Sequence, residues 1–178
     1  MKYFIQSLTL FRIISAPLIF LIITLYEYYG WALILLLLAS LSDYWDGYLA
    51  RKYNLESVLG EILDPIADKI LIVFIVVALT LELSSLIFGF MGSLILAREF
   101  WVGALRDFNS RNDNSHLTKV TFLAKIKTTL QLMTFCIFLI GLYLNNALIL
   151  FSANFLLFLA LIVTIQTGLS YTFASFRN

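Results

Sequence analysis

The sequence predicts an all-α integral membrane protein, a bundle of six transmembrane helices with both termini in the cytoplasm. The 178 residues are 61% hydrophobic and 13% charged, and their mean hydropathy is +0.94. A soluble domain of this length cannot bury so many apolar side chains. Six spans of about 20 residues each fill most of the chain and leave only short loops. Residues 1–178 are therefore expected to form a single membrane domain.

The first three helices are predicted at 6–27, 31–51 and 58–81. The first apolar run reaches Tyr26 and is interrupted by Arg12, which favours a retained span over a cleaved signal peptide. The second helix carries its charges near its end, and the third carries most of its charges near its start. The runs are continuous and rich in leucine and isoleucine rather than alternating, which argues against a β-barrel.

The last three helices are predicted at 84–106, 119–144 and 147–173. The connection at 107–118 is polar and has no apolar pattern, as expected of a solvent-facing loop. The other connections are much shorter. An even number of spans places both termini on the same side of the membrane.

The basic residues predict which side that is. With six spans, all twelve lie in loops on one side of the membrane or in the helix halves nearest to it. The loops on the other side contain Glu27 and Glu82 and neither lysine nor arginine. Because basic residues favour the cytoplasmic side, both termini and the loop at 107–118 are expected there. The basic residues are Lys2, Arg12, Arg51, Lys52, Lys69, Arg98, Arg106, Arg111, Lys119, Lys125, Lys127 and Arg177.

The net charge and the cysteine content exclude further classes of function. The formal net charge is +1, so there is no basic surplus of the kind that binds nucleic acid. Cys136 is the sole cysteine, which excludes an internal disulfide and a multi-cysteine metal site.

Four aspartates lie inside the predicted spans. Asp43 and Asp46 are near the end of the second helix, and Asp64 and Asp68 are near the start of the third. An ionised group at mid-bilayer costs about 2.5–3.5 kcal/mol, and an aspartate is too short to reach the interface. All four sit roughly 5–15 Å below the cytoplasmic helix ends. Spacings of three and four residues place each pair on one helix face, so the four carboxylates are expected to converge.

Converging carboxylates need compensating positive charge, which two divalent cations would supply. Hard oxygen ligands favour Mg²⁺ or Mn²⁺, and paired ions about 3.5–4 Å apart are typical of sites for attack on phosphorus. Arg98, Lys125 and Lys127 fall in the same layer, so we expect one polar pocket open to the cytoplasm. A second interpretation is a cation transporter, but neither access from the opposite side nor repeated halves are evident.

The aspartates belong to a longer motif that resembles a known family. Residues 43–68 read D-x2-D-G-x2-A-R-x8-G-x3-D-x3-D, which is similar to the signature of the CDP-alcohol phosphatidyltransferases. The resemblance covers nearly the whole chain. It implies a six-helix fold in a bacterial cytoplasmic membrane, usually a homodimer, with a two-metal site that faces the cytoplasm. It also implies transfer of a phosphatidyl group from CDP-diacylglycerol to an alcohol, with release of CMP.

The resemblance also implies roles for individual residues. Asp43, Asp46 and Asp64 would be metal ligands, and Asp68 would be both a metal ligand and the catalytic base. The residues expected to line the CDP-diacylglycerol site are Gly47, Ala50, Arg51 and Gly60.

Three further stretches resemble the family members that use glycerol 3-phosphate as acceptor, namely 63–69, 97–108 and 125–131. The candidates for binding the acceptor phosphate are Arg98, Lys127, Lys125 and Arg106. One alternative is that Arg98 only pairs with Glu99 or with an aspartate. Another is that the acceptor is inositol phosphate, serine or phosphatidylglycerol. Thr9 and Arg12 either contact the pyrophosphate or anchor the first helix.

Overall fold

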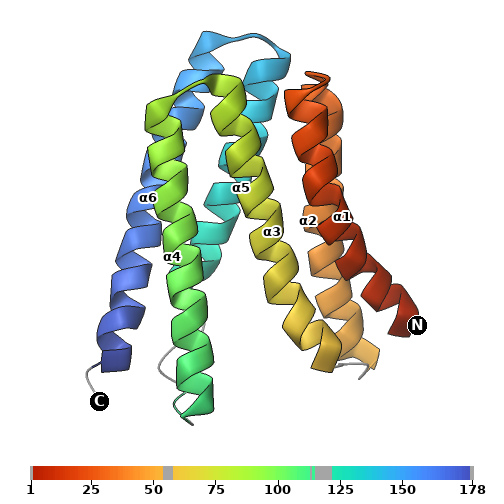
Figure 1. Ribbon diagram of the computed structural model, residues 1–178, viewed down its shortest axis with the longest axis vertical. Coiled ribbons are helices and arrows are strands. Elements are labelled where there is room, and N and C mark those ends of the chain that lie inside the picture. The colour runs from red at the N-terminus through yellow and green to blue at the C-terminus, as the bar shows by residue number, and fades with distance from the viewer. Residues whose placement is uncertain (1, 54–57, 113, 115–121, 177–178) are drawn as a thin grey trace. The chain divides into compact units, whose positions relative to one another are not determined.

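The computed structural model describes residues 2–53, 58–112, 114 and 122–176, and it confirms the predicted all-α membrane fold (Figure 1). These residues form six helices and no strand. The helices are α1 (Lys2–Thr24), α2 (Tyr29–Tyr53), α3 (Val58–Leu83), α4 (Leu86–Arg111), α5 (Phe122–Tyr143) and α6 (Ala147–Phe176).

Five helices in the described part of the chain are long and apolar enough to cross a membrane. The sixth, α3, falls short because every 18-residue window in it carries at least three charged residues. Asp64, Asp68 and Lys69 are among these charges, so it is the charges of candidate site residues, and not a lack of apolar residues, that set α3 apart. The protein is an integral membrane protein. The side on which its termini lie stays a prediction.

The fourth helix is longer than the sequence predicted. Its expected end was residue 106, with a loop from 107, but the helix continues to Arg111. Asp107 and Arg111 form an i,i+4 ion pair of 2.8 Å, and the amide of buried Asn109 donates to the Ser175 hydroxyl at 2.7 Å. The polar segment 107–111 thus continues α4, with Asn109 bonded to α6 and Asp107 paired with Arg111 inside the helix. The expected start of the fifth helix at 119 lies outside the described residues.

The chain divides into two compact units. The first comprises Met1–Ser85 and Leu142–Asn145, and the second comprises Leu86–Gly141 and Asn146–Asn178. The four aspartates belong to the first unit, and the candidate acceptor cations belong to the second. The prediction of a single domain stays a prediction.

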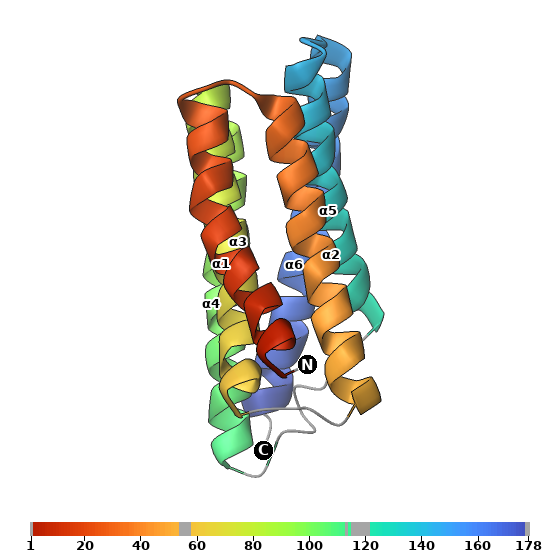
Figure 2. The same ribbon diagram turned by 90° about the vertical axis from the view of Figure 1, so that its right-hand side faces the viewer.

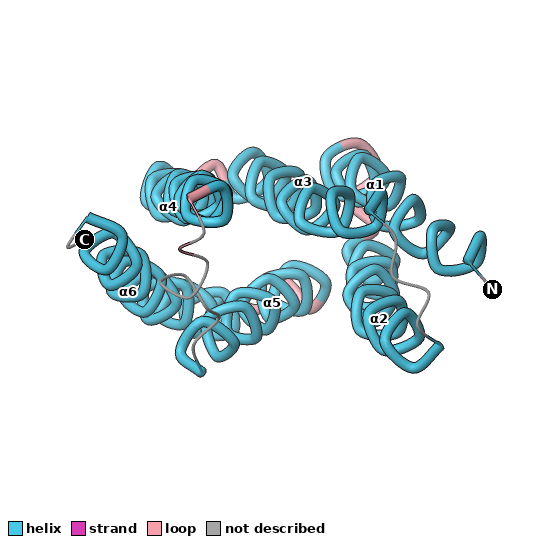
Figure 3. Tube along the Cα trace, turned by 90° about the horizontal axis from the view of Figure 1, so that it is seen from below, coloured by secondary structure: helices cyan, strands magenta, loops and turns pink. Residues whose placement is uncertain are grey.

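In the first unit, α1 packs against both α2 and α3 (Figures 2 and 3). Alanines are fully buried on all three helices, including Ala16 on α1, Ala39 on α2 and Ala67 on α3. Small residues let helix backbones approach closely, and such packing drives helix association in membranes. Phe20 of α1 also meets Phe74 of α3 edge to face, with ring centroids 6.1 Å apart. This packing brings the polar residues of α1 beside those of its two neighbours.

In the second unit, α4 packs along α6. The contact includes the buried side chains of Val102 on α4 and Tyr171 on α6. Gly168 of α6 is also buried, and a Cβ added there would lie 2.9 Å from Cγ of Arg98. A glycine at this position therefore gives the Arg98 side chain room to lie against α6.

Candidate active site

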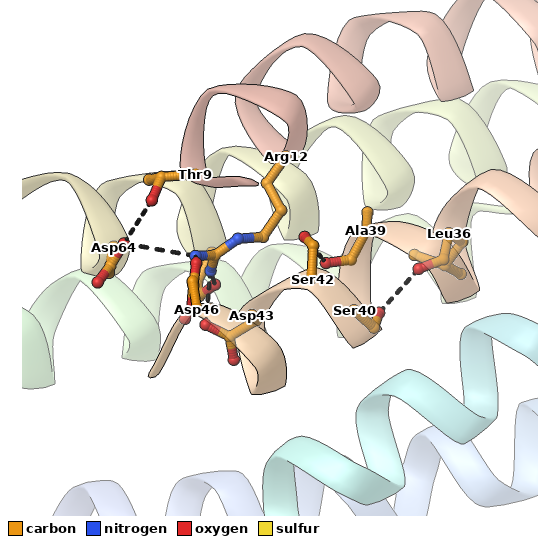
Figure 4. Close-up of polar contacts among 10 residues, drawn as sticks. Thr9, Arg12, Leu36, Ala39, Ser40, Ser42, Asp43, Asp46 and Asp64 are labelled. Atoms are coloured by element: carbon orange, nitrogen blue, oxygen red, sulfur yellow. Dashed lines mark hydrogen bonds and ion pairs between the residues drawn. The ribbon is translucent and has the colours of Figure 1, made fainter. Parts of the chain in front are cut away.

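The first unit gathers the four aspartates around one arginine. Asp43 and Asp46 come from α2, and Asp64 and Asp68 come from α3, each pair on one helix face. Between them lies the guanidinium of Arg12, which extends from α1. Figure 4 shows the side chains of Arg12, Asp43, Asp46 and Asp64 pointing toward one another.

The guanidinium forms an ion pair with all four carboxylates. Its Nη1 donates to Asp43 and to Asp68, at 2.6 Å in each case. Its Nη2 donates to Asp46 and, at a longer distance of 3.4 Å, to Asp64. The planar fork of an arginine presents several donors at once, which suits this role better than the single ammonium of a lysine would.

A threonine of α1 supports the cluster. Thr9 lies three residues before Arg12, and its hydroxyl donates to Oδ1 of Asp64 at 2.9 Å. The same oxygen accepts the longer bond from Arg12. Asp64 is therefore held by two donors on one face of α1.

The cluster is closed on one side and open on the other. The Arg12 side chain is fully buried, and that of Asp46 is 3% exposed. By contrast, the side chains of Asp43 and Asp68 are each 50% exposed, and that of Asp64 is 41% exposed. A ligand can therefore approach these three carboxylates, while Asp46 forms the floor of the site.

The charges of the cluster are not balanced. Four carboxylates against one guanidinium leave three formal negative charges. Such a charge inside a membrane is costly unless cations neutralise it. The donor set consists of carboxylate oxygens, the ligands that Mg²⁺ and Mn²⁺ prefer. By its chemistry, the cluster fits the divalent cations that the sequence predicted.

The residues expected to line the donor site are only partly described. Gly47 follows Asp46 on α2, and Gly60 lies one turn before Asp64 on α3; both are partly exposed. Neither glycine has a side chain that would cover the helix backbone beside the aspartates. The expectations for Ala50 and Arg51 concern side chains that lie outside the described residues.

The second unit contains a separate buried cluster of charges. Glu99 of α4 accepts from Nη1 of Arg98 at 3.1 Å and forms an ion pair with the ammonium of Lys127 on α5. The side chains of both cations are more than 90% buried. The pairing of Arg98 with Glu99 that the sequence suggested is thus present, and Lys127 shares the same carboxylate.

Arg98 also ties α4 to α6. Its Nε donates to the backbone oxygen of Thr164 at 3.0 Å, and its Nη2 donates to the Thr167 hydroxyl at 2.7 Å. Gln131 of α5 donates to the Thr164 hydroxyl at 3.1 Å. Arg98 therefore has a structural role whatever else it binds.

The two further acceptor candidates lie differently. Arg106 is exposed, and its guanidinium carbon lies 5.7 Å from the ring centroid of Tyr171. The Lys125 side chain lies outside the described residues. Arg106 therefore lies against an aromatic ring, and no ion pair between it and Glu99 is among the bonds described.

Sequence reasoning did not place Arg12 among the aspartates or recognise Glu99 as a shared partner. A signal for Arg12 was available. It is the only charged residue in the first apolar run, and Thr9 precedes it by three residues, so two polar side chains share one helix face. The partner helices could not be identified from spacing alone.

Comparison with known proteins agrees with the motif. The family model described as CDP-alcohol phosphatidyltransferase matches residues 6–166. Several relatives carry the name CDP-diacylglycerol–glycerol-3-phosphate 3-phosphatidyltransferase. One from Rickettsia bellii is 41% identical over 139 residues, covering 78% of this chain and 75% of the relative. One from Rickettsia typhi is 37% identical over 184 residues, covering 96% of each. One from Salmonella choleraesuis is 30% identical over 172 residues, covering 94% of this chain and 92% of the relative.

The match to the family model spans most of the chain and includes the whole motif from Asp43 to Asp68. It also includes Arg12, Arg98, Glu99 and Lys127, so both charged clusters lie within the matched region. The chain belongs to the CDP-alcohol phosphatidyltransferase family.

Proposed function

We propose that this protein transfers the phosphatidyl group of CDP-diacylglycerol to sn-glycerol 3-phosphate, giving phosphatidylglycerophosphate and CMP. The observation that carries the proposal is the meeting of all four motif aspartates at one guanidinium, in a chain of this family. The relatives named for this reaction, one aligned over 96% of both chains, support glycerol 3-phosphate as the acceptor.

The aspartates are the proposed metal ligands. Asp43, Asp46, Asp64 and Asp68 would hold two divalent cations, Mg²⁺ or Mn²⁺, which would neutralise phosphate charge and activate the attacking hydroxyl. The three formal negative charges left over by Arg12 support this role, because they leave the cluster able to take up cations.

The proposed reaction is a direct displacement at the phosphorus that carries the lipid. The 1-hydroxyl oxygen of the acceptor forms a bond to this phosphorus while the bond to the bridging oxygen breaks, and that oxygen leaves with CMP. Asp68 accepts the hydroxyl proton. Its half-exposed side chain supports this assignment over Asp46, which lies at the floor of the cluster. No covalent enzyme intermediate is needed.

The donor is proposed to lie over the motif glycines. Gly47 and Gly60 would admit the nucleotide close to the helix backbones, with Ala50 beside them. Arg51, at the cytoplasmic rim, would pair with a phosphate of the donor.

The acceptor phosphate is proposed to bind the cations of the second unit. Arg98 and Lys127 now share the single carboxylate of Glu99, which leaves one formal positive charge for an anion. Lys125 and Arg106 would add positive charge at the edge of this site. Neutral alcohols would gain nothing from these cations, which supports an anionic acceptor.

The proposal places the enzyme in a bacterial cytoplasmic membrane, with the aspartates facing the cytoplasm, where both substrates are available. The distribution of basic residues supports this orientation. A homodimer, implied by the family resemblance, is part of the same proposal.

A purified-enzyme assay tests the function. The protein in detergent micelles receives CDP-diacylglycerol and, in separate reactions, glycerol 3-phosphate, inositol phosphate, serine or phosphatidylglycerol. CMP release and the lipid product are followed by mass spectrometry. We expect turnover with glycerol 3-phosphate, loss of turnover in chelator, and recovery with Mg²⁺ or Mn²⁺. Preference for another alcohol would reassign the acceptor, and full turnover in chelator would refute the metal site.

A further inference from the structure

We propose that Arg12 is the built-in counter-ion of the aspartate cluster: it holds the four carboxylates together in the metal-free protein and gives up contacts with them when divalent cations bind. The inference rests on the metal site proposed above. It makes Arg12 a positioning residue that competes with the metals for the same oxygens.

One guanidinium contacts carboxylates from two helices, and each terminal nitrogen bridges α2 and α3. Nη1 joins Asp43 to Asp68, and Nη2 joins Asp46 to Asp64. The arginine thus occupies the centre at which the carboxylates meet, the position that shared cations would need.

Among the described residues, no three acidic, histidine or cysteine side chains are arranged to hold a metal ion as they stand. Mg²⁺ needs its oxygens at about 2.0–2.1 Å around one ion, whereas here one oxygen of each carboxylate is turned toward a terminal nitrogen of Arg12. The carboxylates can close around a metal only if the guanidinium withdraws.

The Arg12 side chain is fully buried, and its Nε has no hydrogen-bond partner among the described residues. Its charge is therefore compensated by the aspartates, with no help from solvent. A buried arginine of this kind stabilises the carboxylates that surround it, and its removal leaves them to repel one another.

The contact of Arg12 with Asp64 is the longest of the four, and Thr9 already donates to the same oxygen of Asp64 at 2.9 Å. Asp64 therefore keeps a donor when Arg12 withdraws. The α1 helix can remain attached to α3 through Thr9 while the arginine exchanges partners.

The test measures metal binding without substrate. Purified protein is titrated with Mn²⁺, and free Mn²⁺ is followed by its electron paramagnetic resonance signal. Arg12→Met removes the charge and keeps a long side chain. We expect Arg12→Met to bind Mn²⁺ at least about tenfold more tightly than the wild type, a change of about 1.4 kcal/mol, because a competing positive charge is gone. Asp43→Asn should weaken binding.

A matched control separates competition from a general charge effect. Arg111 is an arginine whose side chain is 76% exposed and pairs with Asp107, not with the cluster. Arg111→Met should bind Mn²⁺ as the wild type does. Thermal unfolding gives a second readout: Mn²⁺ should raise the Tm of Arg12→Met by more than it raises the Tm of the wild type.

If Arg12→Met does not fold, Arg12→Lys takes its place. A lysine keeps the charge but cannot pair with four carboxylates, so we expect tighter Mn²⁺ binding than in the wild type and a larger rise in Tm on adding Mn²⁺. Saturable Mn²⁺ binding with the same or weaker affinity in the Arg12 variant would overturn this inference alone. The absence of saturable binding in every protein would overturn the proposed metal site and this inference with it.

Discussion

Asp43 offers the cleanest single-residue test of the aspartate cluster. Its side chain is half exposed and contacts only one nitrogen of Arg12 in the structure described, so asparagine fits the same space and removes one charge. We expect Asp43→Asn to be folded but at least about a hundredfold less active, a loss typical of removing one group that stabilises a transition state. CMP release and a thermal unfolding curve measure the two properties.

Ser40 provides the control for Asp43 on the same helix. Its hydroxyl donates to the backbone oxygen of Leu36, one turn away, and not to the cluster. Ser40→Ala should keep wild-type activity. Comparable turnover of Asp43→Asn and Ser40→Ala would remove Asp43 from the catalytic machinery.

Lys127 is the better residue for testing the acceptor site. Arg98 also bonds to Thr164 and Thr167, so its loss would disturb the packing of α4 on α6. Lys127 contacts only Glu99 among the bonds described, and methionine replaces its long apolar stem. We expect Lys127→Met to raise the KM for glycerol 3-phosphate about tenfold, with little change in the KM for CDP-diacylglycerol. Steady-state kinetics with each substrate varied in turn measure both KM values. An unchanged KM for glycerol 3-phosphate would show that its phosphate binds elsewhere.

Single residues also show what sequence could and could not predict. The aspartates were identifiable because their spacing is local: three residues in α2 and four in α3. The contacts of Arg12 span 31 to 56 residues of sequence, and only the packing of α1 against two other helices creates them. Glu99 was recognised as a partner of its neighbour Arg98, but the contact with Lys127 on another helix was not.

At the scale of the helices, Gly168 controls how α4 meets α6. A Cβ there would lie 2.9 Å from Cγ and 3.2 Å from Nε of Arg98, whose side chain cannot move freely because it bonds to α6. We expect Gly168→Ala to lower stability by about 1–3 kcal/mol, the usual cost of overpacking. Thermal unfolding in detergent measures the change.

Gly30 of α2 provides the matched control. A Cβ there would lie 3.4 Å from the nearest atom, on the Tyr143 ring, which is ordinary contact. Gly30→Ala should therefore leave the Tm unchanged or raise it slightly, because alanine favours helix. An equal loss of Tm in both variants would show that the close contact with Arg98 is not the cause.

The helices themselves were predictable because apolar runs long enough to cross a membrane leave few other options. The residues at which the helices begin and end were less predictable. The extension of α4 to Arg111 depends on Asn109 packing against Ser175 of α6, a contact 66 residues apart. Composition marks 107–111 as polar, and polarity alone does not distinguish a loop from a helix that continues beyond the membrane.

At the scale of the whole molecule, the orientation in the membrane follows from charge. All lysines and arginines are expected toward one side, so the end of α4 near Arg111 should face the cytoplasm and its start near Leu86 should face outward. Ser84 and Ser110 are exposed residues near these two ends. Each can be replaced by cysteine with little change in size, in a background where Cys136→Ala removes the sole native thiol.

We expect Ser84→Cys to react with a membrane-impermeant maleimide in intact cells, whereas Ser110→Cys should react only after the membrane is permeabilised. Enzyme activity of both variants confirms that the fold is retained. Because the two sites flank the same helix, the result does not depend on how the two units are arranged. Labelling of Ser110→Cys in intact cells, with Ser84→Cys protected, would reverse the orientation. It would also place the aspartate cluster on the side away from the cytoplasm, where CDP-diacylglycerol and glycerol 3-phosphate are not supplied, and so contradict the proposed function as well.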